Sequence, residues 1–199
     1  MSRPFRLILA SQSPRRAQLL REAGFAFEQT SPPFADPDQP APHPDPAAFV
    51  AELALKKARS LRAGLDGEAV ILSADTVCVD EAGNLLGKPC DRGDAGRMLR
   101  LLAGGRQRVL TGVAILGPGG QTVNFADEAV VRCGPVAETQ IQAALDANGW
   151  QGKAGGYNLF DLQAAGWPLE VEGDETAVVG LPMKRVAPEL VKKGMVSKA

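Results

Sequence analysis

The feature that most constrains the fold is a change of pattern near the start of the chain, where a short apolar run gives way to a helix start. Leu7–Ala10 is apolar and has the length of a buried strand. Ser13 is a favoured N-cap, Pro14 suits the first helical position, and apolar residues then recur with helical spacing up to Ala23. The sequence therefore predicts a strand followed directly by a helix over residues 14–23, the opening unit of an α/β fold.

Strands and helices continue to alternate along the 199 residues. We expect helices over residues 47–62, 94–102, 138–148 and 187–193, and extended segments over 25–30, 69–73, 76–80, 108–116 and 122–131. Helices on both sides of a mixed sheet would satisfy this order. We expect a single domain over residues 1–199, with a frayed tail over 194–199.

Composition limits the classes of function. A formal net charge of −1 gives no field to attract nucleic acid or a membrane surface, and no apolar run approaches the roughly 20 residues that span a bilayer. The cysteines Cys78, Cys90 and Cys133 are scattered, without disulfide or metal-site spacing, which favours a reduced, cytoplasmic setting. With His43 as the only histidine, catalysis would fall to carboxylates, lysines, arginines and a metal ion.

Two arginines stand at the start of the first helix. Arg15 and Arg16 lie where a helix exposes unpaired N–H groups and a partial positive charge, a combination that binds anions and above all phosphate. The alternative is an ordinary capped helix with two solvated arginines.

Three further positions carry groups suited to phosphate chemistry. Asp75 follows a buried strand, at the sheet edge where α/β proteins bind ligands, and could coordinate a divalent cation or take a proton from water. Lys88 is fixed between Gly87 and Pro89, and Lys57 is one of two neighbouring lysines on a helix, of which one could face a cleft. Taken alone, Asp75 also fits a structural aspartate that caps a turn, and Lys88 and Lys57 each fit a solvated surface lysine.

A proline-rich stretch over residues 31–46 carries seven prolines. A loop of this length is unusual in a compact domain and suits either a functional lid or a surface insertion. Asp36 is its acidic candidate, although loop aspartates are most often solvated turn residues.

In this order the motifs resemble the Maf family of nucleoside triphosphate pyrophosphatases. The resemblance covers residues 7–183 and rests on five blocks: Ser11-Gln12-Ser13-Pro14-Arg15-Arg16, Ser73-Ala74-Asp75-Thr76, Gly87-Lys88-Pro89, Lys153-Ala154-Gly155-Gly156-Tyr157 and Val178-Val179-Gly180-Leu181-Pro182. It implies an α/β fold with an elongated mixed sheet, flanked by helices, and two lobes around a central cleft. It also implies hydrolysis of the α–β phosphate bond, a divalent cation (Mg or Mn) and a homodimer.

The resemblance assigns roles residue by residue. Asp75 resembles the acceptor of a water proton, with Lys88 and Asp36 as further catalytic candidates and with Asp75 and Asp36 as metal candidates. The phosphate-contacting set is Ser13, Arg15, Arg16, Lys57 and Lys88. Arg15 and Thr76 resemble positions that select a pyrimidine such as dTTP or UTP.

One departure from the family bears on the base. Where members acting on pyrimidines carry a glutamine, this chain has Phe160, or Asp161 if one residue is inserted. Phenylalanine can only stack, and an ionised aspartate can only accept a hydrogen bond. The same chemistry on 7-methyl-GTP or on a broad set of noncanonical nucleotides is therefore the alternative substrate. A non-enzymatic regulator of septum formation that binds nucleotide is the alternative of another class.

Overall fold

A computed structural model of the protein describes residues 5–34, 43–65 and 67–197. Within that part of the chain, seven strands form one mixed sheet in the order β2-β1-β3-β5-β6-β7, and β4 pairs with β3. The strands are β1 (Leu7–Ala10), β2 (Glu28–Thr30), β3 (Val70–Val79), β4 (Leu85–Leu86), β5 (Arg106–Leu116), β6 (Thr122–Cys133) and β7 (Leu169–Glu172). β1 runs parallel to β2 and β3, whereas β3, β5, β6 and β7 form an antiparallel set.

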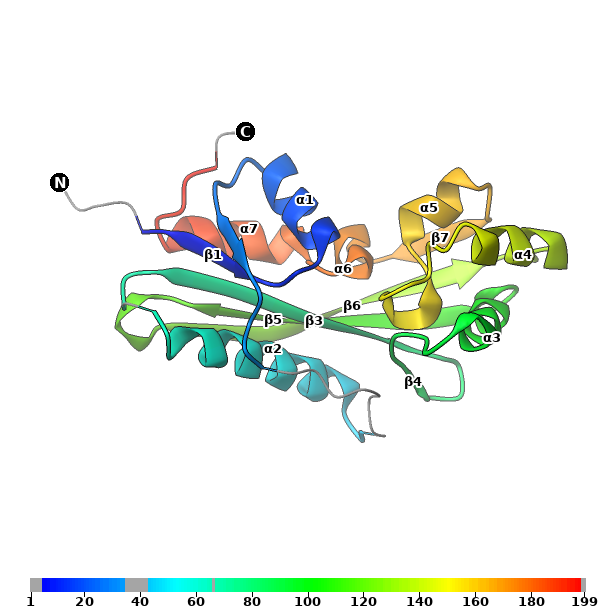
Figure 1. Ribbon diagram of the computed structural model, residues 1–199, viewed down its shortest axis with the longest axis horizontal. Helices are drawn as coiled ribbons and strands as arrows, with labels where there is room; N and C mark the ends of the chain where they lie inside the picture. Colours follow the sequence, from blue (N-terminus) through cyan, green and yellow to red (C-terminus); the bar gives the residue numbers. More distant parts are fainter. Residues whose placement is uncertain (1–4, 35–42, 66, 198–199) are drawn as a thin grey trace.

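The helices divide unequally between the two faces of the sheet. They are α1 (Pro14–Glu22), α2 (Pro46–Arg62), α3 (Arg92–Leu102), α4 (Glu138–Asp146), α5 (Leu159–Ala164), α6 (Glu175–Val179) and α7 (Met183–Lys192), with single 3₁₀ turns at Pro118–Gly120 and Ala154–Gly156. α2 lies along one face, and the others lie on the opposite side (Figure 1). The expected mixed sheet flanked by helices is confirmed.

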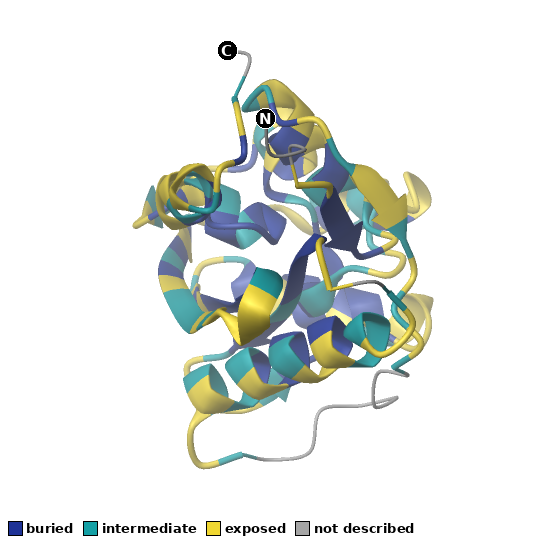
Figure 2. Cartoon of the chain, turned by 90° about the vertical axis from the view of Figure 1, so that its left-hand side faces the viewer, coloured by how far each residue is buried: buried dark blue, intermediate teal, exposed yellow. Residues whose placement is uncertain are grey.

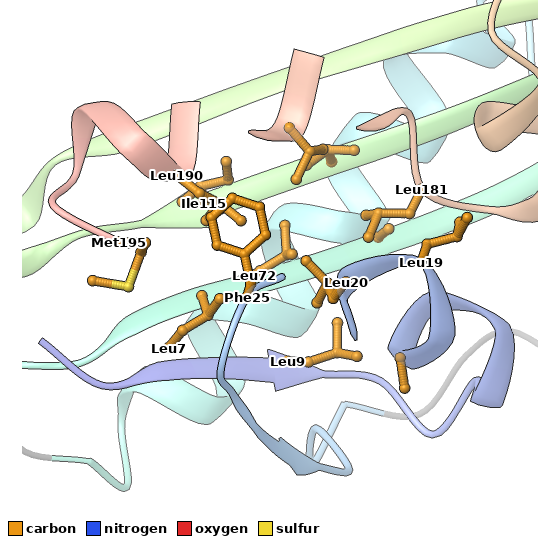
Figure 3. Close-up of a cluster of buried hydrophobic side chains, with 14 of the residues drawn as sticks. Leu7, Leu9, Leu19, Leu20, Phe25, Leu72, Ile115, Leu181, Leu190 and Met195 are labelled. Carbon is orange, nitrogen blue, oxygen red and sulfur yellow. The ribbon is translucent and has the colours of Figure 1, made fainter. Parts of the chain in front are cut away.

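Two hydrophobic clusters lie on the face opposite α2. The first, here called the terminal cluster, is shown in Figure 3 and includes Leu7, Leu9, Leu20, Phe25, Leu72, Ile115, Leu181, Leu190 and Met195. The second, here called the central cluster, includes Cys78, Leu99, Leu102, Val109, Val131, Ile141, Leu159 and Trp167. α1 and α7 cover one end of the sheet and α3, α4 and α5 the other, so the clusters form two lobes (Figure 1).

β3 connects the two lobes, because its alternate side chains enter both of them. Leu72 and Ala74 belong to the terminal cluster and Cys78 to the central cluster, on the same face of the strand.

The exposure of each strand follows its position in the sheet. The central strand β1 is buried, whereas the edge strand β2 is largely exposed (Figure 2).

α2 packs closely against the other face. Its buried residues are Val50, Leu53, Ala54, Lys57 and Ala58, the spacing of one helical face. Gly112 on β5 makes the approach possible, because a Cβ atom at this position would lie 2.1 Å from the carbonyl oxygen of Val50. The glycine thus sets the distance between the helix and the sheet.

Several elements differ from the sequence-based expectation. The two extended segments expected around Ser73 and Thr76 form one continuous strand, β3. α5 and β7 were not expected, and Val178 and Val179 end a short helix, α6, whose N-cap is Asp174. A tight turn joins β3 to β4, with Asp80 N donating to Asn84 O at 3.0 Å.

No helix in the described part of the chain combines the length and apolar character that crossing a membrane requires.

We expect Gly112→Ala to lower the free energy of unfolding by about 3 kcal/mol, because the added methyl group would meet main-chain atoms of α2 that cannot rotate away. Urea unfolding measures the change. Gly67→Ala is the matched control, since a Cβ atom there would meet nothing within 4 Å. Equal unfolding midpoints for the two variants would contradict the close packing of α2.

Candidate active site

The site lies where β3 has no neighbouring strand on one edge. β1 pairs with β3 only at Val70–Leu72, and β4 pairs with it only at Cys78 and Val79. A cavity of about 490 Å³ opens between these two pairings. Seven of the residues that the sequence singled out line it: Ser13, Arg15, Arg16, Lys57, Asp75, Thr76 and Lys88.

The start of α1 forms one wall. Ser13 is the N-cap, and its hydroxyl accepts from Arg16 N at 3.5 Å, with Pro14 in the first turn as expected. The Ser11 hydroxyl accepts from Ser13 N at 3.2 Å and so fixes the turn that leads into the helix. The positive end of the α1 dipole therefore borders the cavity.

Arg16 is held by three hydrogen bonds to described residues. Its Nε donates to Gly180 O at 2.8 Å, and its Nη1 donates to Ser11 Oγ at 3.1 Å. Its Nη2 donates to Thr76 Oγ1 at 3.1 Å. These contacts come from the loop before α1, from β3 and from the end of α6, so the guanidinium is fixed by three separate elements.

A chain of hydroxyl groups continues from Arg16 into the protein. Thr111, which is fully buried, donates to Ala177 O at 2.8 Å and so uses its only hydroxyl proton. The 2.9 Å contact between Thr76 Oγ1 and Thr111 Oγ1 must then be donated by Thr76. The Thr76 oxygen is thereby left to accept from Arg16, which fixes the direction of every bond in the chain.

Asp75 is joined to α2 by an ion pair. Lys57 Nζ contacts Asp75 Oδ1, and the two side chains are 7% and 14% exposed. Lys56, the next residue, lies on the exposed side of the helix and pairs with Glu52 at 2.7 Å. Of the two lysines, Lys57 is the one that faces the cleft, because it continues the sheet-facing stripe of α2.

Arg15 lies apart from this network. Burial lowers the pKa of its guanidinium, an effect that the negative charge of Asp161 opposes. Among the described residues no group forms a hydrogen bond or ion pair with it. Arg15 is therefore a partly desolvated cation at the cavity wall, an arrangement that favours an anionic ligand.

The two positions considered for the missing glutamine lie differently. Asn158 caps α5 by accepting from Phe160 N at 3.1 Å, and the Phe160 ring is left 44% exposed and is not part of the cavity wall. Asp161 also lies outside the wall but pairs with Lys153 at 3.2 Å. Neither side chain is part of the cavity wall, although the negative charge of Asp161 acts on Arg15, which is.

Two residues complete the expected set. Lys88 is exposed at the cavity wall, in the segment between β4 and α3. Asp36 lies outside the described residues. Thr111 was not among the predicted site residues, and the signal for it in the sequence is a polar residue within an otherwise buried strand.

The side chains that could act as ligands decide how the cavity could hold a metal ion. Asp75 is the one acidic side chain among the described residues that line the cavity, and no group of three or more His, Cys, Asp or Glu residues suited to a metal occurs in the described part of the chain. A cage made by the described side chains alone is therefore absent. One carboxylate together with substrate phosphates is, however, a common way to hold Mg²⁺.

The family model and the curated relatives agree on one family. The model of the Maf-like protein family matches residues 6–193. A dTTP/UTP pyrophosphatase of Symbiobacterium thermophilum is 41% identical over 189 residues, which cover 94% of this chain and 94% of the relative. A dTTP/UTP pyrophosphatase of Hyphomonas neptunium is 39% identical, with 89% and 90% covered. A crystal structure of a nucleoside-triphosphatase / dITP/XTP pyrophosphatase from Mycobacterium abscessus shares 18% identity over 66% of this chain and 76% of its own, with a TM-score of 0.43.

We expect Lys57→Met to lower the free energy of unfolding by about 3 kcal/mol, because it leaves the carboxylate of Asp75 largely buried without its cation. Adding Asp75→Asn removes the stranded charge and should restore most of the loss. Denaturant unfolding of the two single variants and the double variant forms the cycle. Additive losses would show that the two side chains do not interact.

Proposed function

The chain belongs to the Maf-like protein family, and on that premise we propose that it hydrolyses the α–β phosphate bond of a nucleoside triphosphate. The products are a nucleoside monophosphate and pyrophosphate, and the substrates are dTTP and UTP.

The observation that carries this proposal is the charge distribution of the cavity. Among the described residues that line the cavity, Asp75 is the one carboxylate, and it lies among cations that include Arg15, Arg16, Lys57 and Lys88, next to the N-terminus of α1. A triphosphate carries about four negative charges, and its hydrolysis depends mainly on neutralising charge and aligning water. The cations of the cavity wall are suited to neutralising the phosphate charge, and Asp75 is suited to aligning the water.

Asp75 acts as the general base in this proposal. Its pairing with Lys57 fixes the carboxylate at the cavity, and one of its two oxygens takes no part in that contact. That oxygen can orient a water molecule and accept its proton as the water attacks phosphorus. The ion pair also prevents a simple repulsion between the carboxylate and the incoming phosphates.

The phosphates are held by two walls. Ser13, Arg15 and Arg16 approach from α1, whereas Lys57 and Lys88 approach from α2 and from the segment after β4. Because Arg16 is fixed by hydrogen bonds to three elements, its charge needs little reorganisation when the substrate arrives. Thr76 contributes by positioning Arg16, since its hydroxyl is engaged within the protein.

A divalent cation, Mg or Mn, belongs to the proposal. Asp75 would hold it together with phosphate oxygens of the substrate, the donor set that Mg²⁺ accepts. The cation would supply additional neutralisation of the phosphate charge. Asp36, the second acid considered from the sequence, stays a prediction.

Support for the pyrimidine substrate comes from two sources. Both relatives described above carry the name dTTP/UTP pyrophosphatase. The Arg15 and Thr76 pair, which resembles the pyrimidine-selecting members, lines the cavity. A preference for 7-methyl-GTP would leave the proposed hydrolysis intact but would refute the pyrimidine substrate.

We expect Asp75→Asn to reduce kcat by about 100-fold or more, because an amide cannot accept the proton of the attacking water. Pyrophosphate release from dTTP, UTP, CTP, 7-methyl-GTP and the purine triphosphates is the measurement. Asp146→Asn, on an exposed carboxylate that pairs with Arg92, is the matched control and should leave the rate unchanged. A rate within tenfold of the wild type would remove Asp75 from the role of base.

Metal dependence has a separate test. We expect EDTA to stop pyrophosphate release and added Mg²⁺ or Mn²⁺ to restore it, because Asp75 and the substrate phosphates together are a donor set suited to such a cation, which would stabilise the charge that develops at the reacting phosphate. Undiminished turnover in EDTA, with dialysed protein and nucleotide, would refute the metal in this proposal.

A further inference from the structure

The segment between α4 and α5 brings to the cavity a cation that the proposed mechanism does not use. Lys153 lines the cavity, and its side chain is 15% exposed. Its main chain is held on both sides, because Lys153 N donates to Trp150 O at 3.2 Å and Lys153 O accepts from Gly156 N at 3.0 Å. The ammonium group is therefore carried by a fixed turn and adds a further positive charge to the cavity wall.

Asp161 is the partner of this cation. Lys153 Nζ donates to Asp161 Oδ2 at 3.2 Å, the one hydrogen bond that joins the ammonium group to described residues. Asp161 lies in the first turn of α5, its side chain is 57% exposed, and it is not part of the cavity wall. A ligand in the cavity would therefore meet Lys153 without meeting the carboxylate that neutralises it.

The same carboxylate acts on a second cation of the wall. Arg15 lies in the first turn of α1, which packs in the terminal cluster, whereas α5 packs in the central cluster (Figure 1). Burial lowers the pKa of the Arg15 guanidinium, and the negative charge of Asp161 opposes this effect. One acid outside the cavity thus reduces the positive potential of two cations in its wall, one from each lobe.

The products of the proposed hydrolysis give this reduction a consequence. Pyrophosphate keeps most of the charge of the triphosphate, so the cations that attract the substrate also retain this product. Attraction that is equal for the substrate and the transition state lowers KM without raising kcat, and attraction for the product slows its release. A carboxylate that does not touch the ligand weakens this attraction without adding a repulsive contact inside the cavity.

We propose that Asp161 is a counter-charge that limits the affinity of the cavity for polyphosphate anions and so allows pyrophosphate to leave. It acts through Lys153 and Arg15 and is not a catalytic residue. The inference rests on the proposed function, which identifies the anion. It also gives a role to one of the two positions considered for the missing glutamine, because Asp161 then sets the strength of phosphate binding and does not read the base.

The test is calorimetric titration with inorganic pyrophosphate, without a divalent cation, so that binding is measured apart from turnover. We expect Asp161→Asn to bind pyrophosphate about threefold more tightly than the wild type at about 0.02 M ionic strength, because the amide no longer offsets the two cations. At about 0.5 M the difference should vanish, since the carboxylate is exposed and its charge is screened. Inorganic monophosphate, which carries less charge, should show a smaller difference.

Two variants serve as controls. Glu172→Gln removes the same charge from an exposed pair with Arg132, and both of these residues are outside the cavity wall, so the affinity for pyrophosphate should not change. Asp161→Glu keeps the charge and should bind as the wild type does. If Asp161 served only to hold Lys153 in place, Asp161→Asn would bind pyrophosphate more weakly. That result, equal affinities, or no binding to either protein would overturn the proposal.

Release of pyrophosphate from UTP is measured in parallel. In Asp161→Asn we expect KM for UTP and the inhibition constant of pyrophosphate to fall together, with no rise in kcat. Absence of turnover in every variant, the wild type included, would refute the proposed hydrolysis, while the titration would still decide the role of Asp161. Turnover with an unchanged affinity for pyrophosphate would refute the role of Asp161 alone.

Discussion

The architecture depends on a mismatch in strand length. β3 has ten residues, and its parallel neighbour β1 has four. β1 therefore covers only the beginning of β3, and β4 covers only its end. The uncovered middle becomes a cavity because the helices of the two lobes pack over the two ends of the strand and leave its centre open.

The functional side chains reach this opening from three directions, and each is fixed by an independent structural reason. Lys57 reaches it because it continues the buried face of α2, and α2 lies close because Gly112 has no side chain. Arg16 reaches it because Ser13 starts a helix at that point. Asp75 needs no loop at all, because it lies within β3 itself. A site built on a helix face, a helix start and a strand is positioned by rigid elements.

The sequence was sufficient for the parts of the site that local rules determine. The cap at Ser13, the strand before Asp75 and the helix that carries Lys57 all follow from short-range patterns, and the structure brings their residues together. The hydrogen bonds from Thr76 to Thr111 and on to Ala177 could not be foreseen, because these residues are far apart in the chain and meet only through the sheet and α6. α5 and β7 were missed because six and four residues are too few to reveal a period.

The two lobes differ in how they are distributed along the chain. The central cluster is drawn from residues 78–167, whereas the terminal cluster combines residues 7–25, 70–74 and 113–115 with residues 179–195. During synthesis, Leu7, Leu9 and Leu20 are made well before their partners Leu181, Leu190 and Met195. Leu72 and Ile115 can cover part of this apolar surface earlier, but the side that packs against α7 stays open until residues 179–195 have been translated. The terminal lobe is therefore completed after the central lobe, and in that interval it exposes the kind of apolar surface that chaperones bind.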